Sequence, residues 1–322
     1  MKRISISPPV AALILAIVLF LLSGLLPNGY GSDLQVARAQ ATNIVRLAVF
    51  LGVIAAGQTL VIISGSEGID LSAGSVVTLT AILTYVIVSG ADARVLLAFL
   101  VSLAVGALIG LLNGVGITFL KISPFVMTLG MSGVVTGAII VVNHGNVSGK
   151  IAPIMTRLIA RPISPVVPIP GAIIIWLIFG VLMWLLLERT AFGKNLFAIG
   201  VNRVTARLSG VDVTGMNLLT YSLAGLLAGF GGFLVVGNTG VVLIQLGQPF
   251  LFPSIAAVAV GGTLLSGGKG SYWGTMAGAI VLTLITSLLT TMQMPDSVRR
   301  MVLGGTLLVL ISIYGRQRSL RQ

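Results

Sequence analysis

The sequence contains no cysteine, a single histidine and few charged residues, which together occupy 8% of its 322 positions. Without cysteine, the chain has no disulfide, no thiolate nucleophile and no cysteine-ligated metal site. Soluble globular domains carry about 25% charged residues. These absences exclude thiol chemistry and argue against a soluble protein.

Motifs of enzymes are missing as well. His144 stands beside Asn143 with no second imidazole or carboxylate nearby in the sequence, so neither a metal site nor a catalytic triad is predicted there. The stretch 266–271 resembles a phosphate-binding loop only superficially, because Thr263 and Gly270 stand where that loop requires other residues. We predict no catalytic residue, no cofactor and no metal ion, and we place any ATP hydrolysis on another polypeptide.

Apolar residues, by contrast, make up 56% of the chain. A helix needs roughly 20 mostly apolar residues to cross the hydrocarbon core of a membrane. Ten apolar segments are found, at residues 10–27, 44–64, 72–89, 95–112, 124–142, 168–187, 214–237, 253–265, 272–292 and 298–314. We predict an all-α polytopic membrane bundle of about ten transmembrane helices, forming a single domain over residues 1–322.

Basic residues indicate the orientation of this bundle. The net charge is +12, but lysine and arginine are scattered among loops, and no aromatic-studded basic face is present that would bind nucleic acid. With the N-terminus inside, the inner loops hold 11 of the 19 lysines and arginines, in the direction of the positive-inside rule. Both termini and the long loop 188–213 are therefore predicted to be cytoplasmic.

Glycine occurs 41 times and forms two kinds of pattern. Small residues at four-residue spacing allow close helix approach in membranes, and they occur as Gly106/Gly110/Gly114, Gly133/Gly137, Gly225/Gly229 and Gly274/Gly278. Two further glycine-rich stretches, 64–74 and 261–270, carry polar residues at the ends of apolar segments. They predict interrupted helices of the kind that line cavities in transporters.

Polar side chains within the apolar segments are candidates for a translocation path. Glu67 and Asp70 would either form a cation or proton site or cap the next helix, where a carboxylate accepts backbone N–H groups. Amides and hydroxyls suit a neutral polyhydroxyl solute better than an ion, although each also serves to hold helices together. The predicted path residues are Gln58, Asp70, Ser72, Asn113 and Thr128.

The loop 188–213 is the one long polar interruption of the apolar pattern. Within it, residues recur at near-helical spacing at Ala198, Val201, Thr205 and Leu208. This spacing predicts a short amphipathic helix that has Asn202 as a possible cap and ends at Gly210. The residues alone leave open whether this helix docks on a soluble partner or lies on the lipid surface.

Seven motifs, in order along nearly the whole chain, resemble those of the permease subunit of ribose-type sugar ABC importers. They are Glu67–Gly74 (EGIDLSAG), Asn113–Gly114, Pro124–Gly130 (PFVMTLG), Thr190–Lys194 (TAFGK), Ala198–Asn202 (AIGVN), Ala206–Gly210 (ARLSG) and Val260–Thr263 (VGGT). Each motif is weak alone, but seven in register are specific to the family. The loop departs from the family pattern at Val201 and Arg203 without disturbing the helical spacing.

The resemblance implies a second permease copy, a pair of cytoplasmic ATPases and a periplasmic sugar-binding protein, all serving a bacterial inner membrane. It makes the helix at 198–210 a coupling helix, whose motion with the ATPase would open the path for a monosaccharide or similar polar solute. The residues then expected to dock on the ATPase are Asn202, Thr205, Ala206, Arg207, Leu208 and Gly210.

Two alternatives remain at this stage. The same architecture could carry nucleosides or branched-chain amino acids, because a transport fold does not fix its substrate. An ion-coupled secondary transporter would need no ATPase and would use Glu67 and Asp70 as its coupling site.

Overall fold

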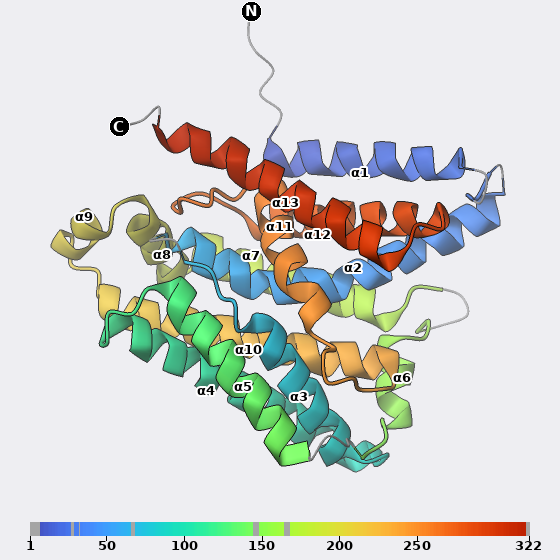
Figure 1. The fold of residues 1–322 in the computed structure, drawn as a ribbon, viewed down its shortest axis with the longest axis horizontal. Helices are drawn as coiled ribbons and strands as arrows, with labels where there is room; N and C mark the ends of the chain where they lie inside the picture. The colour runs from blue at the N-terminus through green and yellow to red at the C-terminus, as the bar shows by residue number, and fades with distance from the viewer. Residues whose placement is uncertain are drawn as a thin grey trace, which may run out of the picture.

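A computed structural model describes residues 7–26, 29–31, 33–65, 68–143, 148–163 and 168–319. Regular secondary structure in these ranges is helical, apart from one isolated β-bridge between Pro162 and Pro170. The helices form one bundle, in which most of the long ones run along the horizontal axis of Figure 1. The prediction of an all-α bundle is confirmed.

Each of the ten predicted apolar segments contains a helix. The ten are α1 (Pro8–Gly24), α2 (Leu34–Ile63), α3 (Ala73–Val88), α4 (Val95–Thr118), α5 (Pro124–Asn143), α7 (Gly171–Arg189), α10 (Val213–Thr239), α11 (Leu251–Val260), α12 (Tyr272–Thr291) and α13 (Asp296–Ser319). Shorter elements connect them: η1 (Asp92–Arg94), α6 (Pro153–Ile159), α8 (Ala191–Val201), α9 (Arg203–Leu208) and η2 (Gln248–Phe250).

Among the described residues, six helical segments are long and apolar enough to cross a membrane. A count of ten crossings stays a prediction. Four boundaries were predicted wrongly by five residues or more: α2 begins at Leu34 and not at 44, α4 ends at Thr118 and not at 112, α11 ends at Val260 and not at 265, and α13 ends at Ser319 and not at 314. Helix α11 stops early because the chain turns at Gly262, whose φ is +87°. Glycine adopts this conformation without strain.

Helix α2 forms the centre of the bundle. Every residue from Ala48 to Ile63 is buried, and the helix packs against α7, α10, α11 and α12. The Tyr272 hydroxyl donates to the carbonyl oxygen of Gly52 at 3.0 Å and accepts the Trp176 indole N–H at 3.0 Å. A helix that is apolar on all sides belongs inside a bundle, so α2 is the core around which the others are arranged.

Close contact between α4 and α10 holds one side of the bundle together. A Cβ atom on Gly106 or Gly110 would overlap the backbone of α10, and one on Gly225 would overlap the backbone of α4. Without a hydrophobic drive between helices in lipid, such close packing is a main source of their association. The four-residue glycine spacing on α4 and α10 therefore serves the packing of these two helices against each other.

The glycines of α5 have no such neighbour. A Cβ atom on Gly130, Gly133 or Gly137 would meet no other atom within 4 Å. The buried residues of this helix, among them Val135 and Ile139, lie on its opposite side. The described part of the chain thus offers nothing that this glycine face packs against.

Two interruptions bend the chain inside the bundle. Residues 64–72 separate α2 from α3, as the glycine-rich stretch predicted. Residues 240–250 separate α10 from α11 and return to α3, where the Gly247 N–H donates to the Thr78 hydroxyl at 3.0 Å. The sequence did not predict this second contact.

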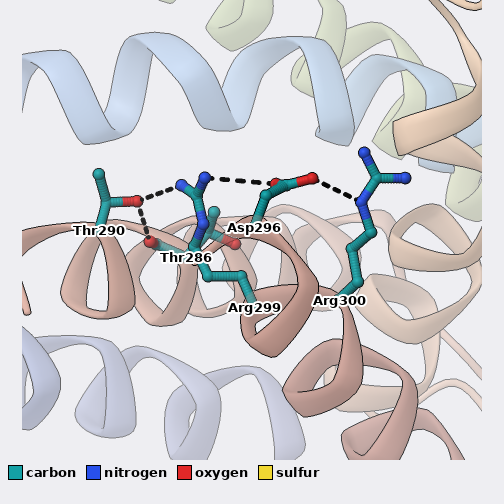
Figure 2. A network of polar contacts seen from close by, with 5 residues as sticks. All are labelled: Thr286, Thr290, Asp296, Arg299 and Arg300. Atoms are coloured by element: carbon teal, nitrogen blue, oxygen red, sulfur yellow. Dashed lines mark hydrogen bonds and ion pairs between the residues drawn. The ribbon is translucent and has the colours of Figure 1, made fainter. Parts of the chain in front are cut away.

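Polar contacts hold the turn between α12 and α13 (Figure 2). The Asp296 carboxylate accepts from Arg299 at 3.3 Å and from Arg300 at 2.7 Å. Arg299 also donates to the Thr290 hydroxyl at 2.7 Å, which in turn donates to the carbonyl oxygen of Thr286 at 2.8 Å. Because Asp296 is 59% exposed, each ion pair stabilises the fold by only about 0–1 kcal/mol.

Candidate functional site

The long polar loop folds into two helices instead of one. Helices α8 and α9 meet at Asn202, whose backbone is extended (φ −158°, ψ 108°). Its side-chain oxygen accepts the N–H groups of Val204 and Thr205 at 3.0 Å each. The predicted cap is confirmed, but the continuous helix at 198–210 is wrong, because a capping residue adopts non-helical backbone angles.

An apolar surface is exposed along these two helices. Val201, Val204 and Leu208 are 72%, 69% and 83% exposed; we call these three side chains the α9 face. In Figure 1, α9 projects at the end of the bundle opposite α6. An apolar cluster exposed at the tip of a bundle is typical of a site that contacts another molecule.

The predicted docking residues fall on two sides of α9. The exposed ones are Asn202, Thr205, Arg207, Leu208 and Gly210. Ala206 is only 4% exposed, so its side chain points into the bundle and not outward. Ala206 is therefore removed from the set of side chains that could touch a partner docked on this face.

The two arginines of α9 differ in their surroundings. Arg207 is exposed, whereas Arg203 is half-buried. Burial lowers the pKa of the Arg203 guanidinium from its ordinary value, and the positive charge of Arg207 lowers it further, against the opposing effect of the Tyr221 hydroxyl. Arginine keeps its proton in proteins, so the exposed end of α9 is positively charged.

A second cluster lies in the interior, where the structure brings all five predicted path residues together. Gln58 pairs with the backbone of Asp70, donating to its carbonyl oxygen at 2.6 Å and accepting its N–H at 3.2 Å. The Asp70 carboxylate accepts the backbone N–H of Ser72 at 2.8 Å and also its hydroxyl. Asn113 donates to that hydroxyl at 2.9 Å, and Thr128 accepts the N–H of Leu71 at 3.0 Å.

This buried network holds the link between α2 and α3. Backbone groups that leave a helix within a membrane must find other partners, and Gln58 of α2 and Thr128 of α5 supply them here. Asn113 of α4 instead bonds the Ser72 hydroxyl. The Asp70 carboxylate accepts the N–H of Ser72, the N-cap residue of α3. It therefore bonds beside the helix start that the capping hypothesis gave it, and not within the first turn. Its companion Glu67 lies outside the described residues, as does His144.

All five side chains of the network are at most 2% exposed, so they are shielded from solvent in this structure. One hydrogen-bonding atom nevertheless has no partner among the described residues: the side-chain oxygen of Asn113. A buried acceptor without a partner costs about 1–3 kcal/mol. The network therefore has capacity to accept one more hydroxyl or N–H donor.

Comparison with known proteins places the chain. A family model described as the permease component of the branched-chain amino acid transport system matches residues 40–311. The chain belongs to this permease family. The match covers both the α9 face and the buried network of the permease.

Individual relatives of the permease are named for sugars. A ribose import permease protein of Bacillus subtilis (strain 168) is 34% identical over 279 residues, which are 86% of this chain and 84% of the relative. A galactose/methyl galactoside import permease protein of Salmonella typhimurium is 31% identical over 88% of this chain and 86% of the relative. A fructose import permease protein of Rhizobium meliloti is 30% identical over 84% and 76%. No solved structure matches the permease.

Proposed function

We propose that the permease is the transmembrane subunit of an ATP-driven importer that carries a monosaccharide across a bacterial inner membrane. The observation that carries this proposal is the α9 face, three exposed apolar side chains at the tip of a chain that has no ATP-binding motif. Relatives named for ribose, galactose and fructose favour a sugar over the amino acids of the family description. Nucleosides and branched-chain amino acids remain the alternative substrates.

The α9 face is suited to a groove on a cytoplasmic ATPase. Its apolar side chains would be buried there, and Arg207 would add charge recognition at the rim. Closure of the ATPase pair around ATP would then move α8 and α9 as a rigid body. In this proposal the permease itself hydrolyses no ATP.

The buried network supplies groups for a sugar path. Its amide and hydroxyl groups exchange hydrogen bonds with a neutral polyol without a stranded charge, and the free oxygen of Asn113 would accept a sugar hydroxyl. In the transport cycle, the link carrying Asp70 and Ser72 would separate from α4 and α5 and so open the passage. A periplasmic binding protein would deliver the sugar at the end opposite α9.

Contacts at the end of the bundle that carries α9 support the proposed orientation, with a cytoplasmic N-terminus. Helix α1 begins at Pro8 beside Gly262, in the loop that also contacts α8, which supports a cytoplasmic N-terminus. The exposed basic residues Lys194, Arg207 and Lys269 belong to this end, consistent with the positive-inside rule. The C-terminus would be cytoplasmic as well.

A charge placed on the α9 face tests the proposed docking. We expect Leu208→Glu to weaken ATPase binding by at least about 2 kcal/mol, because a carboxylate would be buried in an apolar groove. Tagged permease, co-expressed with a candidate ABC ATPase, is purified in mild detergent, and the bound ATPase is quantified. Leu208 is preferred to Ala206 because a substitution at the buried alanine would also disturb the fold.

Arg161→Glu is the control, since it places the same residue at an exposed position of the opposite end. It should retain the ATPase. If wild type purifies alone and solute uptake needs only a proton or sodium gradient, the ion-coupled alternative replaces the ATPase model.

The glycine face of α5 is the surface proposed for the second permease copy. Its three glycines face open space, whereas the same spacing on α4 is filled by α10. We expect Gly133→Leu to lower the association constant of the permease dimer at least about tenfold, or 1.4 kcal/mol. Single-molecule counting of labelled permease in lipid measures the dimer fraction, and Val181→Leu on the exposed face of α7 is the control. An unchanged dimer fraction would place the interface elsewhere.

A further inference from the structure

Three segments that are distant in sequence meet at the C-terminal end of α8. The Gly268 N–H donates to the carbonyl oxygen of Ile63, the last residue of α2, at 2.9 Å. Gly200 of α8 packs directly on both of these groups. A Cβ atom on Gly65 would also lie 3.2 Å from the Cα of Gly200. We call the contact among Ile63, Gly65, Gly200, Gly267 and Gly268 the α8 joint.

Only glycine fits at the centre of this joint. A Cβ atom on Gly200 would overlap the Ile63 carbonyl oxygen and the Gly268 backbone nitrogen. Both obstacles are backbone atoms, so no flexible side chain could move aside. Gly267 and Gly268 have φ values of +89° and +75°, in the left-handed region that favours glycine. Glycine weakens a helix relative to alanine, so Gly200 contributes through this contact and not through helix stability.

The joint connects α8 to the α2–α3 link and to the α11–α12 loop. From Ile63, the chain continues into the link that holds Asp70 and Ser72 in the buried network. Gly267 and Gly268 belong to the loop that joins α11 to α12. The α8 joint is thus the place where the helix leading to the α9 face touches the α2–α3 link and the α11–α12 loop at once.

We propose that Gly200 is a positioning residue that makes the α8 joint rigid, so that a displacement of α9 moves the α2–α3 link and the α11–α12 loop together. This inference rests on the proposed docking of an ATPase at the α9 face. Backbone groups in van der Waals contact deform less than side chains, because packed interiors are nearly incompressible. A joint of this kind would pass a displacement of α8 on to the two segments that it contacts.

Gly200→Ala tests the joint. The added methyl must push α8 away from Ile63, while the exposed α9 face stays intact. We expect the variant to retain the ATPase and its ATP hydrolysis, but to import about 5- to 150-fold less solute per ATP, the usual range of coupling between two sites. Proteoliposomes containing the whole transporter measure uptake and phosphate release in the same sample.

Gly304→Ala is the matched control, because a Cβ atom at that helical glycine meets no neighbour. It should transport like wild type. A general folding defect would lower uptake and hydrolysis in proportion and leave their ratio unchanged, and that result would overturn the inference. If the wild-type permease bound no ATPase, the docking proposal would be refuted instead. The two failures are therefore distinguishable.

Distances measured by spin labels test rigidity without disturbing the joint. The chain has no cysteine, so Lys194→Cys with Lys269→Cys labels only these two exposed positions of α8 and the α11–α12 loop. We expect the distance between the labels to be the same in nucleotide-free and ATP-trapped transporter. The pair Lys194→Cys with Lys121→Cys should report movement relative to the α4–α5 turn. A change in the 194–269 distance as large as in this second pair would show that the joint opens, and the proposal would fail.

Discussion

Replacing Gly110 by leucine should prevent the permease from forming its native bundle. A Cβ atom at this position would overlap the carbonyl oxygen of Tyr221 on α10, so the whole side chain could be placed only by separating α4 from α10. Overpacking of a core by a few methylenes costs typically about 1–3 kcal/mol, and the obstacle here is backbone, so we expect about 3 kcal/mol or more. The midpoint of thermal unfolding and the yield of monodisperse protein in detergent measure the effect.

Gly133→Leu supplies the comparison for this experiment. The substitution is the same, the residue is again a helical glycine in a four-residue pattern, and its surroundings are open. This variant should unfold at the wild-type temperature when monomeric. Equal destabilisation by both substitutions would mean that the α4–α10 contact is looser than the structure shows.

These two glycines also show what the sequence could and could not reveal. Spacing alone indicated that each helix has a face for close approach, but it did not identify the neighbour. Gly110 faces Tyr221 inside the chain, whereas Gly133 faces nothing in the described structure. Which helix packs against a glycine face depends on how the helices are arranged in space. The hydropathy of the sequence carries no information on that arrangement.

The fold class followed from the sequence because lipid imposes a simple rule. Backbone polar groups in the membrane must be bonded within the segment, so long apolar stretches become helices. The exact ends did not follow, since α2 extends through the polar residues 34–43, which can be helical outside the hydrocarbon. The break at Asn202 was missed because its two flanking helices keep nearly the same apolar spacing across it.

The candidate site was predicted in part. Polar residues are few within the apolar segments, and that scarcity identified Gln58, Asn113 and Thr128 before their contacts were known. Their common partner, the α2–α3 link, is formed by residues far away in the sequence. The α8 joint was not predicted, because Gly200 looked like an ordinary helical glycine and its contacts lie more than 60 residues away on either side.

Asp70→Ala should abolish most solute import, whereas Asp70→Asn should leave it close to wild type. Alanine removes the acceptor of both the Ser72 N–H and its hydroxyl, and each buried donor left without a partner costs about 1–3 kcal/mol. The start of α3 would then detach from the network, and import would fall roughly tenfold for each 1.4 kcal/mol lost from the transport-competent state. Uptake of labelled sugar in cells and thermal stability in detergent are measured for both variants.

The asparagine variant distinguishes a structural carboxylate from an ion-coupling one. Its amide oxygen still accepts the Ser72 N–H, so the link keeps its geometry, but it neither exchanges a proton nor pairs with a cation at this site. An ion-coupled transporter would therefore lose function with Asp70→Asn as completely as with Asp70→Ala. Near-normal uptake by asparagine together with failure of alanine would establish that Asp70 acts by holding the α2–α3 link and not as an ion-coupling carboxylate.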